Sequence, residues 1–274
     1  MPNMNKRPDI MGIINATPDS FSDGGRFFDP ETAIAHGRRL AAEGATILDV
    51  GGESTRPGAD EVPIKEEIAR VLPIIKELRT QTDIPISIDT RKPEVAVAAV
   101  EAGATIWNDV TALEFSPDSI TTAKSLGCDI VLMHAQGDPK NMQEKPKYDD
   151  VVEEVFEYLS RRVACCVNAG ILENRLIVDP GIGFGKTTEH NLLLLAHLDR
   201  LTQIGRPVLL GASRKRFISA VDGDSPPDQR LGGSLAAVLT GFAQGCSIFR
   251  VHDVAETRQA LNIADAIENP HLWR

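Results

Sequence analysis

The sequence repeats one pattern along most of its 274 residues: a helical segment ends at a glycine, and a short apolar run follows. Glycine just past a helix takes up the left-handed conformation that ends many helices. Apolar runs that finish in a polar residue are typical of buried strands. The glycines that mark this pattern are Gly44, Gly103, Gly127, Gly170, Gly205 and Gly245.

The runs predict strands at 47–50, 106–107, 130–133, 176–178, 208–210 and 248–251, with two more at 10–14 and 86–88. Helical patterns lie between them, at 30–43, 62–79, 93–102, 116–126, 148–169, 190–203, 232–244 and 254–266. Such alternation of strands and helices predicts an α/β protein with a (β/α)8 TIM barrel. We expect a single domain over 10–274, after a short polar segment at 1–9. A doubly wound open sheet is the alternative, but it usually begins with a Gly-rich dinucleotide turn, which this sequence lacks.

Charge and composition exclude several classes of function. A formal net charge of −10 argues against nucleic acid or an anionic membrane as the main partner. No apolar run approaches the roughly 20 residues that a membrane span needs, and the first residues lack the apolar core of a signal peptide. We therefore expect a cytoplasmic protein. The 4 cysteines have neither metal-ligand spacing nor a disulfide pattern.

In a TIM barrel the chemistry gathers at the carboxyl ends of the strands. Asp89, Asn108 and Asp179 stand at three of these ends. Together they offer several acceptors, which would suit a flat heterocycle with adjacent N–H and NH2 donors. The alternative is structural, with Asp89 paired to Arg91 and Asp179 capping a loop.

Cations gather at other strand ends, which we expect on the opposite side of the barrel mouth. They are Arg56, Arg214, Lys215, Arg216, Arg250 and His252. Phosphate sites on barrels often form in the loops after the last two strands. We therefore expect a substrate with a donor-rich ring at one end and a phosphate at the other. For Arg214 and Arg216 the alternative is a solvated helix start.

Asn15 ends the first strand, and its amide oxygen could bind Mg²⁺ that arrives on a diphosphate, because magnesium often uses few protein ligands plus substrate phosphates. The alternative is that Asn15 only hydrogen-bonds the loop after it.

Three other patterns do not carry chemistry. Residues 181–187 lack one residue of a Walker phosphate loop, His134 and His252 are too few for zinc, and Ser54 and Ser213 lie outside a nucleophile elbow.

The segments 15–25 (NATPDSFSDGG) and 49–58 (DVGGESTRPG) closely resemble the two signature loops of the dihydropteroate synthase family. Further matches occur in order along the chain from about residue 10 to 267. They are Asp89-Thr90, Asn108-Asp109, Met133-His134, the segments 179–186 and 211–215, and 250–252. Arg91 departs from the family pattern, where a small residue is expected.

The resemblance implies a transferase that joins 6-hydroxymethyl-7,8-dihydropterin diphosphate to 4-aminobenzoate, giving 7,8-dihydropteroate and diphosphate in folate biosynthesis. It implies that Asp89, Asn108, Asp179 and Lys215 bind the pterin ring, with Met133 and Phe184 as apolar walls. Asn15, Arg250 and His252 match the side that binds diphosphate and Mg²⁺. The aminobenzoate region matches Phe21, Thr55, Arg56, Pro57, Ser213 and Lys215.

Membership would also imply a homodimer and competition by sulfonamides at the aminobenzoate site. Two alternatives remain open. One is the related pterin-binding barrel of methyltetrahydrofolate-dependent methyltransferases, against which the cationic strand ends and segment 54–57 argue. The other is a pterin carrier without catalysis, which would bind the pterin but turn nothing over.

Overall fold

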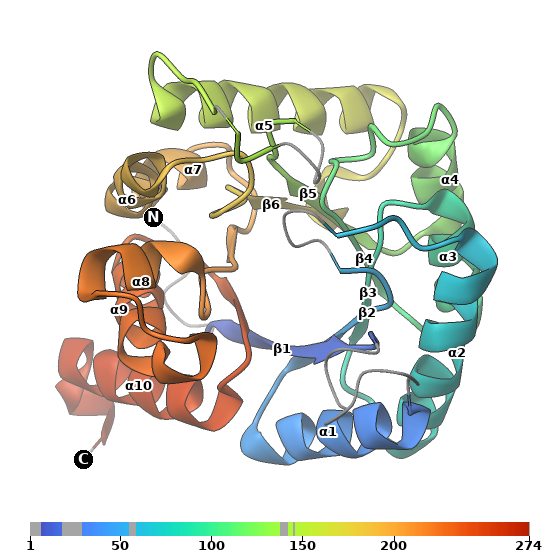
Figure 1. Cartoon of the computed structure of the whole chain (residues 1–274), viewed down its shortest axis with the longest axis horizontal. Helices are drawn as coiled ribbons and strands as arrows, with labels where there is room; N and C mark the ends of the chain where they lie inside the picture. The colour runs from blue at the N-terminus through green and yellow to red at the C-terminus, as the bar shows by residue number, and fades with distance from the viewer. Residues whose placement is uncertain (1–6, 18–28, 55–58, 138–141, 145, 274) are drawn as a thin grey trace.

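The computed structural model of the chain describes residues 7–17, 29–54, 59–137, 142–144 and 146–273. Its strands form one parallel sheet with the order β6-β5-β4-β3-β2-β1-β8-β7. A parallel bridge between Val178 and Val208 links β6 to β7 and brings the two edges of the sheet together. The TIM barrel that the sequence predicts is therefore confirmed, and helices surround the strands (Figure 1).

The strands agree with the sequence prediction to within a few residues. Their bounds are Asp9–Asn15 (β1), Ile47–Gly51 (β2), Ile86–Asp89 (β3), Ile106–Asp109 (β4), Asp129–Met133 (β5), Leu176–Asp179 (β6), Leu209–Leu210 (β7) and Ile248–Val251 (β8).

The helices that cover the barrel are Pro30–Glu43 (α1), Ile64–Gln81 (α2), Pro93–Glu101 (α3), Ser119–Leu126 (α4), Val151–Asn168 (α5), Thr188–Ala196 (α6), Leu198–Thr202 (α7), Arg216–Asp222 (α8), Leu231–Ala243 (α9) and Val254–Glu268 (α10). Short 3-10 turns lie at Glu173–Arg175, Pro227–Gln229 and Pro270–Trp273. Among these helices, within the described residues, none combines the length and apolarity needed to cross a membrane.

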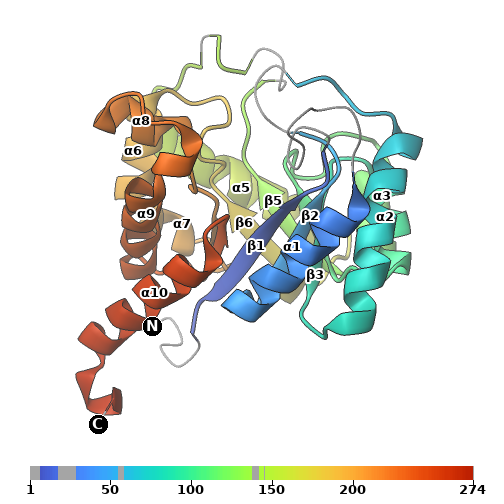
Figure 2. The ribbon, with the colours of Figure 1, turned by 60° about the horizontal axis from the view of Figure 1, so that its bottom comes forward.

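Two helices differ from those that the sequence predicts. The predicted helix 190–203 is broken at His197, whose φ of −131° and ψ of 38° separate α6 from α7. The short helix α8 was not predicted, because its seven residues show only one buried pair, Phe217 and Ile218. Helix α8 follows β7 and lies near the end of the barrel at which β1 finishes (Figure 2).

Apolar side chains fill two separate regions. The larger core lies between the sheet and the helices and includes Leu48, Ile88 and Trp107. A smaller cluster lies inside the barrel and receives one buried side chain from each of seven strands: Met11, Ile47, Ile106, Val131, Ile177, Leu209 and Ile248. This inner cluster forms an apolar floor beneath the carboxyl ends of the strands.

Helix α5 begins three residues later than predicted because Asp150 caps it. The Asp150 side chain accepts hydrogen bonds from the backbone nitrogens of Val152 at 3.0 Å and Glu153 at 3.1 Å. Replacing an N-cap aspartate with alanine costs about 1 kcal/mol. We predict that loss in the free energy of unfolding of Asp150→Ala, measured by urea denaturation. The neighbouring exposed Asp149→Ala is the control, and equal losses in both variants would contradict the capping role.

Candidate active site

The residues at the barrel mouth follow from the alternation of side chains along each strand. Successive side chains on a strand point to opposite faces, so the residue two positions beyond a floor residue also points inward. From the floor this rule leads to a ring of polar and apolar side chains one layer higher. Its members include Asp49, Asn108, Met133, Asp179 and Arg250, with Asp89 at the end of β3.

Arg250 lies between two carboxylates in this layer. Its Nε is 2.7 Å from Oδ2 of Asp49, and its Nη2 is 2.7 Å from Oδ2 of Asp89. Asn108 Nδ2 is 3.5 Å from the other oxygen of Asp49, which is fully buried. One guanidinium therefore holds two buried carboxylates from β2 and β3 and joins them to β8 across the barrel.

Asp89 keeps one acceptor open. Its Oδ1 is buried and has no hydrogen-bond partner among the residues that the structure describes. Burial raises the pKa of Asp89 to about 7. The positive charge of Arg250 opposes this rise, and the negative charge of Asp49 adds to it. A buried acceptor without a donor is costly unless a ligand supplies the donor. The geometry thus points to a ligand with N–H groups directed at β3.

Two expectations from the sequence are corrected by these contacts. Arg250 does not lie apart from the carboxylates, since it contacts both Asp49 and Asp89. The alternative pairing of Asp89 with Arg91 is also wrong. Arg91 instead approaches Glu53 at 3.2 Å and Glu61 at 3.3 Å.

Asp179 both caps a loop and faces the interior. Its Oδ1 accepts a hydrogen bond of 2.7 Å from the backbone nitrogen of Gly181. Burial raises the pKa of Asp179, and the nearby Lys215 opposes that rise. Lys215 donates a hydrogen bond to the carbonyl oxygen of Ile182, and its ammonium lies 4.6 Å from the centre of the Phe184 ring. Asp179, Lys215 and Phe184 are therefore parts of one wall of the site.

The lysine of the Walker-like segment 181–187 points into the protein. Lys186 is buried, and its Nζ lies 2.9 Å from Nδ1 of His134, 3.0 Å from each carbonyl oxygen of Gly181 and Phe184, and 3.3 Å from that of His134. A Cβ on Gly181 would approach the His134 carbonyl oxygen to 1.9 Å, so this turn requires glycine. Burial lowers the pKa of Lys186 well below its usual value and that of His134 to about 3. Lys186 therefore anchors the loop after β6.

The loops after β7 and β8 are joined by polar contacts. Ser213 Oγ lies 3.0 Å from Nδ1 of His252. Arg214, with a φ of 58°, pairs with Asp253 through its Nε at 3.0 Å and through its Nη2. The solvated alternative is therefore wrong for Arg214, whereas Arg216 is exposed at the start of α8.

The remaining predicted residues are only partly placed. Asn15 is the last residue of β1 and is half-buried. Within the described part of the chain, no group of three His, Cys, Asp or Glu side chains could hold a metal. Phe21, Thr55, Arg56 and Pro57 lie outside the described residues. Their roles stay predictions.

Some site residues were missed at the level of sequence. The sequence pattern assigns no role to Lys92, and none to Asp49 beyond its place in the signature segment 49–58. The alternation from Ile47 to Asp49 could have assigned Asp49 to the barrel interior. No local signal reveals that Lys92 is buried at 1% exposure, because its carboxylate partners come from other elements.

Comparison with known proteins decides the family. The family described as "Pterin binding enzyme" matches residues 11–252. Dihydropteroate synthase of Escherichia coli strain K12 is 46% identical over 259 residues, which cover 94% of this chain and 91% of the relative. The chain belongs to the dihydropteroate synthase family. It is accordingly an enzyme of the transferase class.

Solved dihydropteroate synthases have the same fold. The Xanthomonas albilineans enzyme with 4-aminobenzoic acid is 51% identical, with a TM-score of 0.91, and the match covers 97% of this chain and 94% of that one. The enzyme of the same organism in complex with 7,8-dihydropteroate is 47% identical, with a TM-score of 0.87 and coverage of 97% and 95%. A Yersinia pestis dihydropteroate synthase in complex with a sulfonamide drug is 43% identical, with a TM-score of 0.91 and coverage of 96% and 95%.

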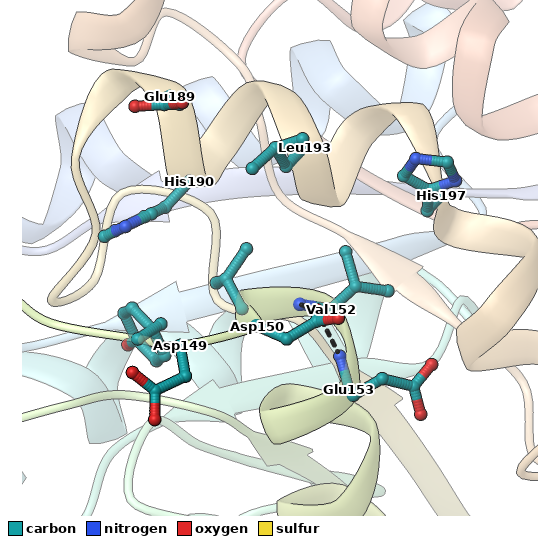
Figure 3. Close-up of a pocket in the computed structure, with 10 residues that line it drawn as sticks. Asp149, Asp150, Val152, Glu153, Glu189, His190, Leu193 and His197 are labelled. Carbon is teal, nitrogen blue, oxygen red and sulfur yellow. Dashed lines mark hydrogen bonds between the residues drawn. The ribbon is translucent and has the colours of Figure 1, made fainter.

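Two hollows lie outside the ring of strand-end residues. A cavity of about 300 Å³ borders the site, since Phe184 lines it together with Arg91, Phe115 and Met142. A larger one of about 620 Å³ lies between the start of α5 and helix α6, and extends along α6 as far as His197 (Figure 3). Two acidic groups of the larger hollow have structural partners: Asp150 caps α5, and Glu153 pairs with Arg200 at 2.7 Å. Neither hollow is lined by Asp89, Asn108 or Asp179.

The contacts of Lys186 predict that it stabilises the fold. In Lys186→Met several buried acceptors lose their donor, which should lower the free energy of unfolding by about 2 kcal/mol. The matched control is Lys147→Met, at an exposed position, which should change little. Urea denaturation measures both. Unchanged stability of Lys186→Met, with loss of affinity for inorganic diphosphate, would instead indicate a phosphate-binding lysine.

Proposed function

We propose that this enzyme condenses 6-hydroxymethyl-7,8-dihydropterin diphosphate with 4-aminobenzoate to form 7,8-dihydropteroate and diphosphate. The observation that carries the proposal is the open, buried Oδ1 of Asp89 above the apolar floor. A pterin presents N–H and NH2 donors along its edge, and the open oxygen of Asp89 can accept from one of them. Related synthases solved with 4-aminobenzoic acid and with 7,8-dihydropteroate support the choice of substrates.

On the pterin side, Asp89, Asn108 and Asp179 are proposed to bind the ring edges. Met133 ends β5 and is buried, which suits an apolar wall. Phe184 lies beneath the Lys215 ammonium at 4.6 Å and would form another wall. A flat ring between these side chains would bury its faces while its polar edges meet the carboxylates.

On the leaving-group side, Arg250, His252 and Asn15 are proposed to act on the diphosphate. His252 contacts Ser213, so the loops after β7 and β8 would bind the anion together. The amide oxygen of Asn15 fits Mg²⁺, a hard cation that needs few protein ligands when substrate phosphates supply others. Bound there, Mg²⁺ would stabilise the negative charge of the diphosphate.

The aminobenzoate is proposed to lie near Ser213 and Lys215. A cationic Lys215 is a suitable partner for a carboxylate. Phe21, Thr55, Arg56 and Pro57 complete this half of the site in the proposal, on the strength of their match to the family's signature loops. Sulfonamide competition in this half is expected from the same match.

The residues support a substitution through charge separation. The bond between the exocyclic methylene carbon and the diphosphate oxygen breaks, and the electron pair leaves with the diphosphate. Asp89 and Asp179 stabilise the positive charge that develops on the pterin, while Arg250 and His252 stabilise the departing anion. The amine nitrogen of 4-aminobenzoate then attacks the methylene carbon and loses a proton. Exclusion of water from the site prevents hydrolysis.

The test is diphosphate release by the purified protein, given the pterin diphosphate and Mg²⁺, with and without 4-aminobenzoate. We expect release that depends on 4-aminobenzoate, with dihydropteroate formed in equal amount. Binding of the pterin diphosphate without turnover would favour a pterin carrier. Absence of binding would reject the assignment of the strand ends.

The ionisation of Lys215 should determine how kcat/KM depends on pH on the alkaline side. Burial lowers the pKa of Lys215 to about 8, although Asp179 raises it. The ammonium is charged below that pH and neutral above it, so attraction to anionic substrates is lost as the pH rises. We predict that kcat/KM falls about tenfold per pH unit above this pKa.

Lys215→Arg is the control for this profile, because arginine stays protonated throughout the accessible range. Its kcat/KM should be lower than that of the wild type but flat between pH 8 and 9, a range that lies above the pKa of Asp89. An alkaline fall of the same midpoint in Lys215→Arg would show that another group titrates.

A homodimer is proposed from the family match. The apolar side chains of Leu239, Ile263 and Ile267 are exposed on α9 and α10, at 36%, 57% and 74%. Burial of such side chains would favour association. Sedimentation equilibrium measures the mass directly, and a monomer at micromolar concentration would reject the proposal.

A further inference from the structure

The turn after β7 contains a backbone conformation that residues other than glycine rarely adopt. Arg214 has a φ of 58°, in the left-handed region. The turn runs from Ala212 to Lys215, and a hydrogen bond of 3.4 Å from the Lys215 nitrogen to the Ala212 carbonyl oxygen closes it. A positive φ at the third position of such a turn favours glycine or asparagine. An arginine in this conformation is strained, and it persists only where the surrounding structure holds it in place.

The backbone of Arg214 is held by two side chains at the start of α9. Its nitrogen donates a hydrogen bond of 2.9 Å to Oγ of the buried Ser234. Its carbonyl oxygen accepts a hydrogen bond of 3.0 Å from Nη1 of Arg230. Arg230 is itself fixed, because its Nε donates to the carbonyl oxygen of Ser225 at 2.8 Å. Both polar backbone groups of the strained residue are therefore bonded.

The side chain of Arg214 reaches the loop after β8. Its Nε lies 3.0 Å from Oδ2 of Asp253, and its Nη2 contacts the other carboxylate oxygen. Pairing of a guanidinium with a carboxylate at two points fixes their orientation as well as their distance. Asp253 stands at the N-cap of α10, yet its side chain makes no capping hydrogen bond to the described backbone of that helix. Its carboxylate pairs with Arg214 instead and joins the two loops.

The residues next to this pair belong to the proposed site. Ser213 and Lys215 lie on either side of Arg214, and His252 directly precedes Asp253. Ser213 Oγ lies 3.0 Å from Nδ1 of His252 and accepts a hydrogen bond of 3.3 Å from the His252 backbone nitrogen. The pair therefore fastens the loops one residue away from the point where Ser213 and His252 meet.

We propose that Arg214 is a positioning residue for the diphosphate half of the site. It touches no substrate and acts through its left-handed backbone, which places Ser213 against His252. The pair with Asp253 offsets the strain of that conformation and fixes the two loops relative to each other. The inference rests on the proposed function, which assigns His252, in contact with Ser213, to the diphosphate.

Residues proposed for the pterin ring have separate support. Asp89 is bonded to Arg250 at 2.7 Å, and Lys215 donates a hydrogen bond to the carbonyl oxygen of Ile182 on the opposite wall. Neither of these bonds involves the pair between the two loops. Loosening the pair should therefore weaken the binding of the pterin diphosphate and spare the free pterin alcohol, which lacks the anion.

The first test compares two substitutions at position 214. Arg214→Ala and Arg214→Gly both remove the pair, but glycine adopts a positive φ without strain. We expect Arg214→Ala to raise the Kd of the pterin diphosphate, measured with Mg²⁺ by isothermal titration calorimetry, by about tenfold. Arg214→Gly should raise it by less than about threefold, because the turn keeps its shape. The Kd of the free pterin alcohol should change less than about twofold in both variants.

The second test loosens the pair from the other loop. Asp253→Asn removes the charge and keeps the size of the side chain, and it should raise the Kd of the pterin diphosphate by about fivefold. Asp228→Asn is the matched control. The hydrogen bonds from Asp253 raise the pKa of Arg214, and the charge of the exposed Asp228 adds to that rise. Asp228→Asn thus removes the same charge near Arg214 without removing the pair, and should change the Kd less than about twofold.

Equal losses in Arg214→Ala and Arg214→Gly would overturn the proposal, because they would indicate a side chain that contacts the anion directly. Equal losses for the pterin diphosphate and the pterin alcohol would also overturn it, since they would indicate a purely structural pair. So would equal losses in Asp253→Asn and Asp228→Asn. Thermal denaturation checks that each variant is folded, and the aspartate variants carry the test if Arg214→Ala does not fold.

Failure of the proposed function would look different. Wild-type protein that releases no diphosphate in response to 4-aminobenzoate would reject that function itself. Every outcome that bears on Arg214 is instead a difference between a variant and the wild type.

Discussion

The site depends on one guanidinium placed inside the barrel. Arg250 contacts Asp49 and Asp89 at 2.7 Å each, immediately above a floor of apolar side chains. Without this cation, two carboxylates would be buried together, which is costly in a region of low dielectric constant. With it, both oxygens of Asp49 have partners, and Asp89 retains one open acceptor. The contacts of Arg250 thus leave one buried oxygen of Asp89 able to accept a hydrogen bond from a ligand N–H group.

The loops after the strands are fastened by buried lysines in two places. Lys186 anchors the loop after β6 through a histidine nitrogen and backbone carbonyls, and Lys92 anchors the segment after β2 through two carboxylates. In both cases the ammonium is nearly inaccessible to solvent. The barrel supplies the strand ends, and these buried contacts then determine where the loops begin.

Much of this arrangement could be predicted from the sequence. Helix-ending glycines such as Gly44, with a φ of 102°, marked the repeating units of the barrel. Asp89, Asn108 and Asp179 were predicted as site residues because they end strands, and the structure places all three at strand ends in the barrel interior or at its mouth. The resemblance to the dihydropteroate synthase family then indicated which reaction the residues at the strand ends carry out.

The rest depends on contacts between distant parts of the chain. Arg250 was predicted to lie opposite the carboxylates, but its partners Asp49 and Asp89 are 201 and 161 residues away in sequence. No local pattern carries that information. The break at His197 and the short helix α8 were missed for a similar reason, because tertiary packing decides such short elements and propensity does not.

The most direct test of the account is the affinity for the free pterin alcohol of two aspartate variants, measured by isothermal titration calorimetry. Asp89 has an open acceptor, whereas both oxygens of Asp49 are occupied by protein donors. Asp89→Asn should therefore weaken binding by about 100-fold, and Asp49→Asn by less than about tenfold, although Asp49→Asn should lower the free energy of unfolding more. Equal losses of affinity in the two variants, or wild-type affinity in Asp89→Asn, would contradict the account.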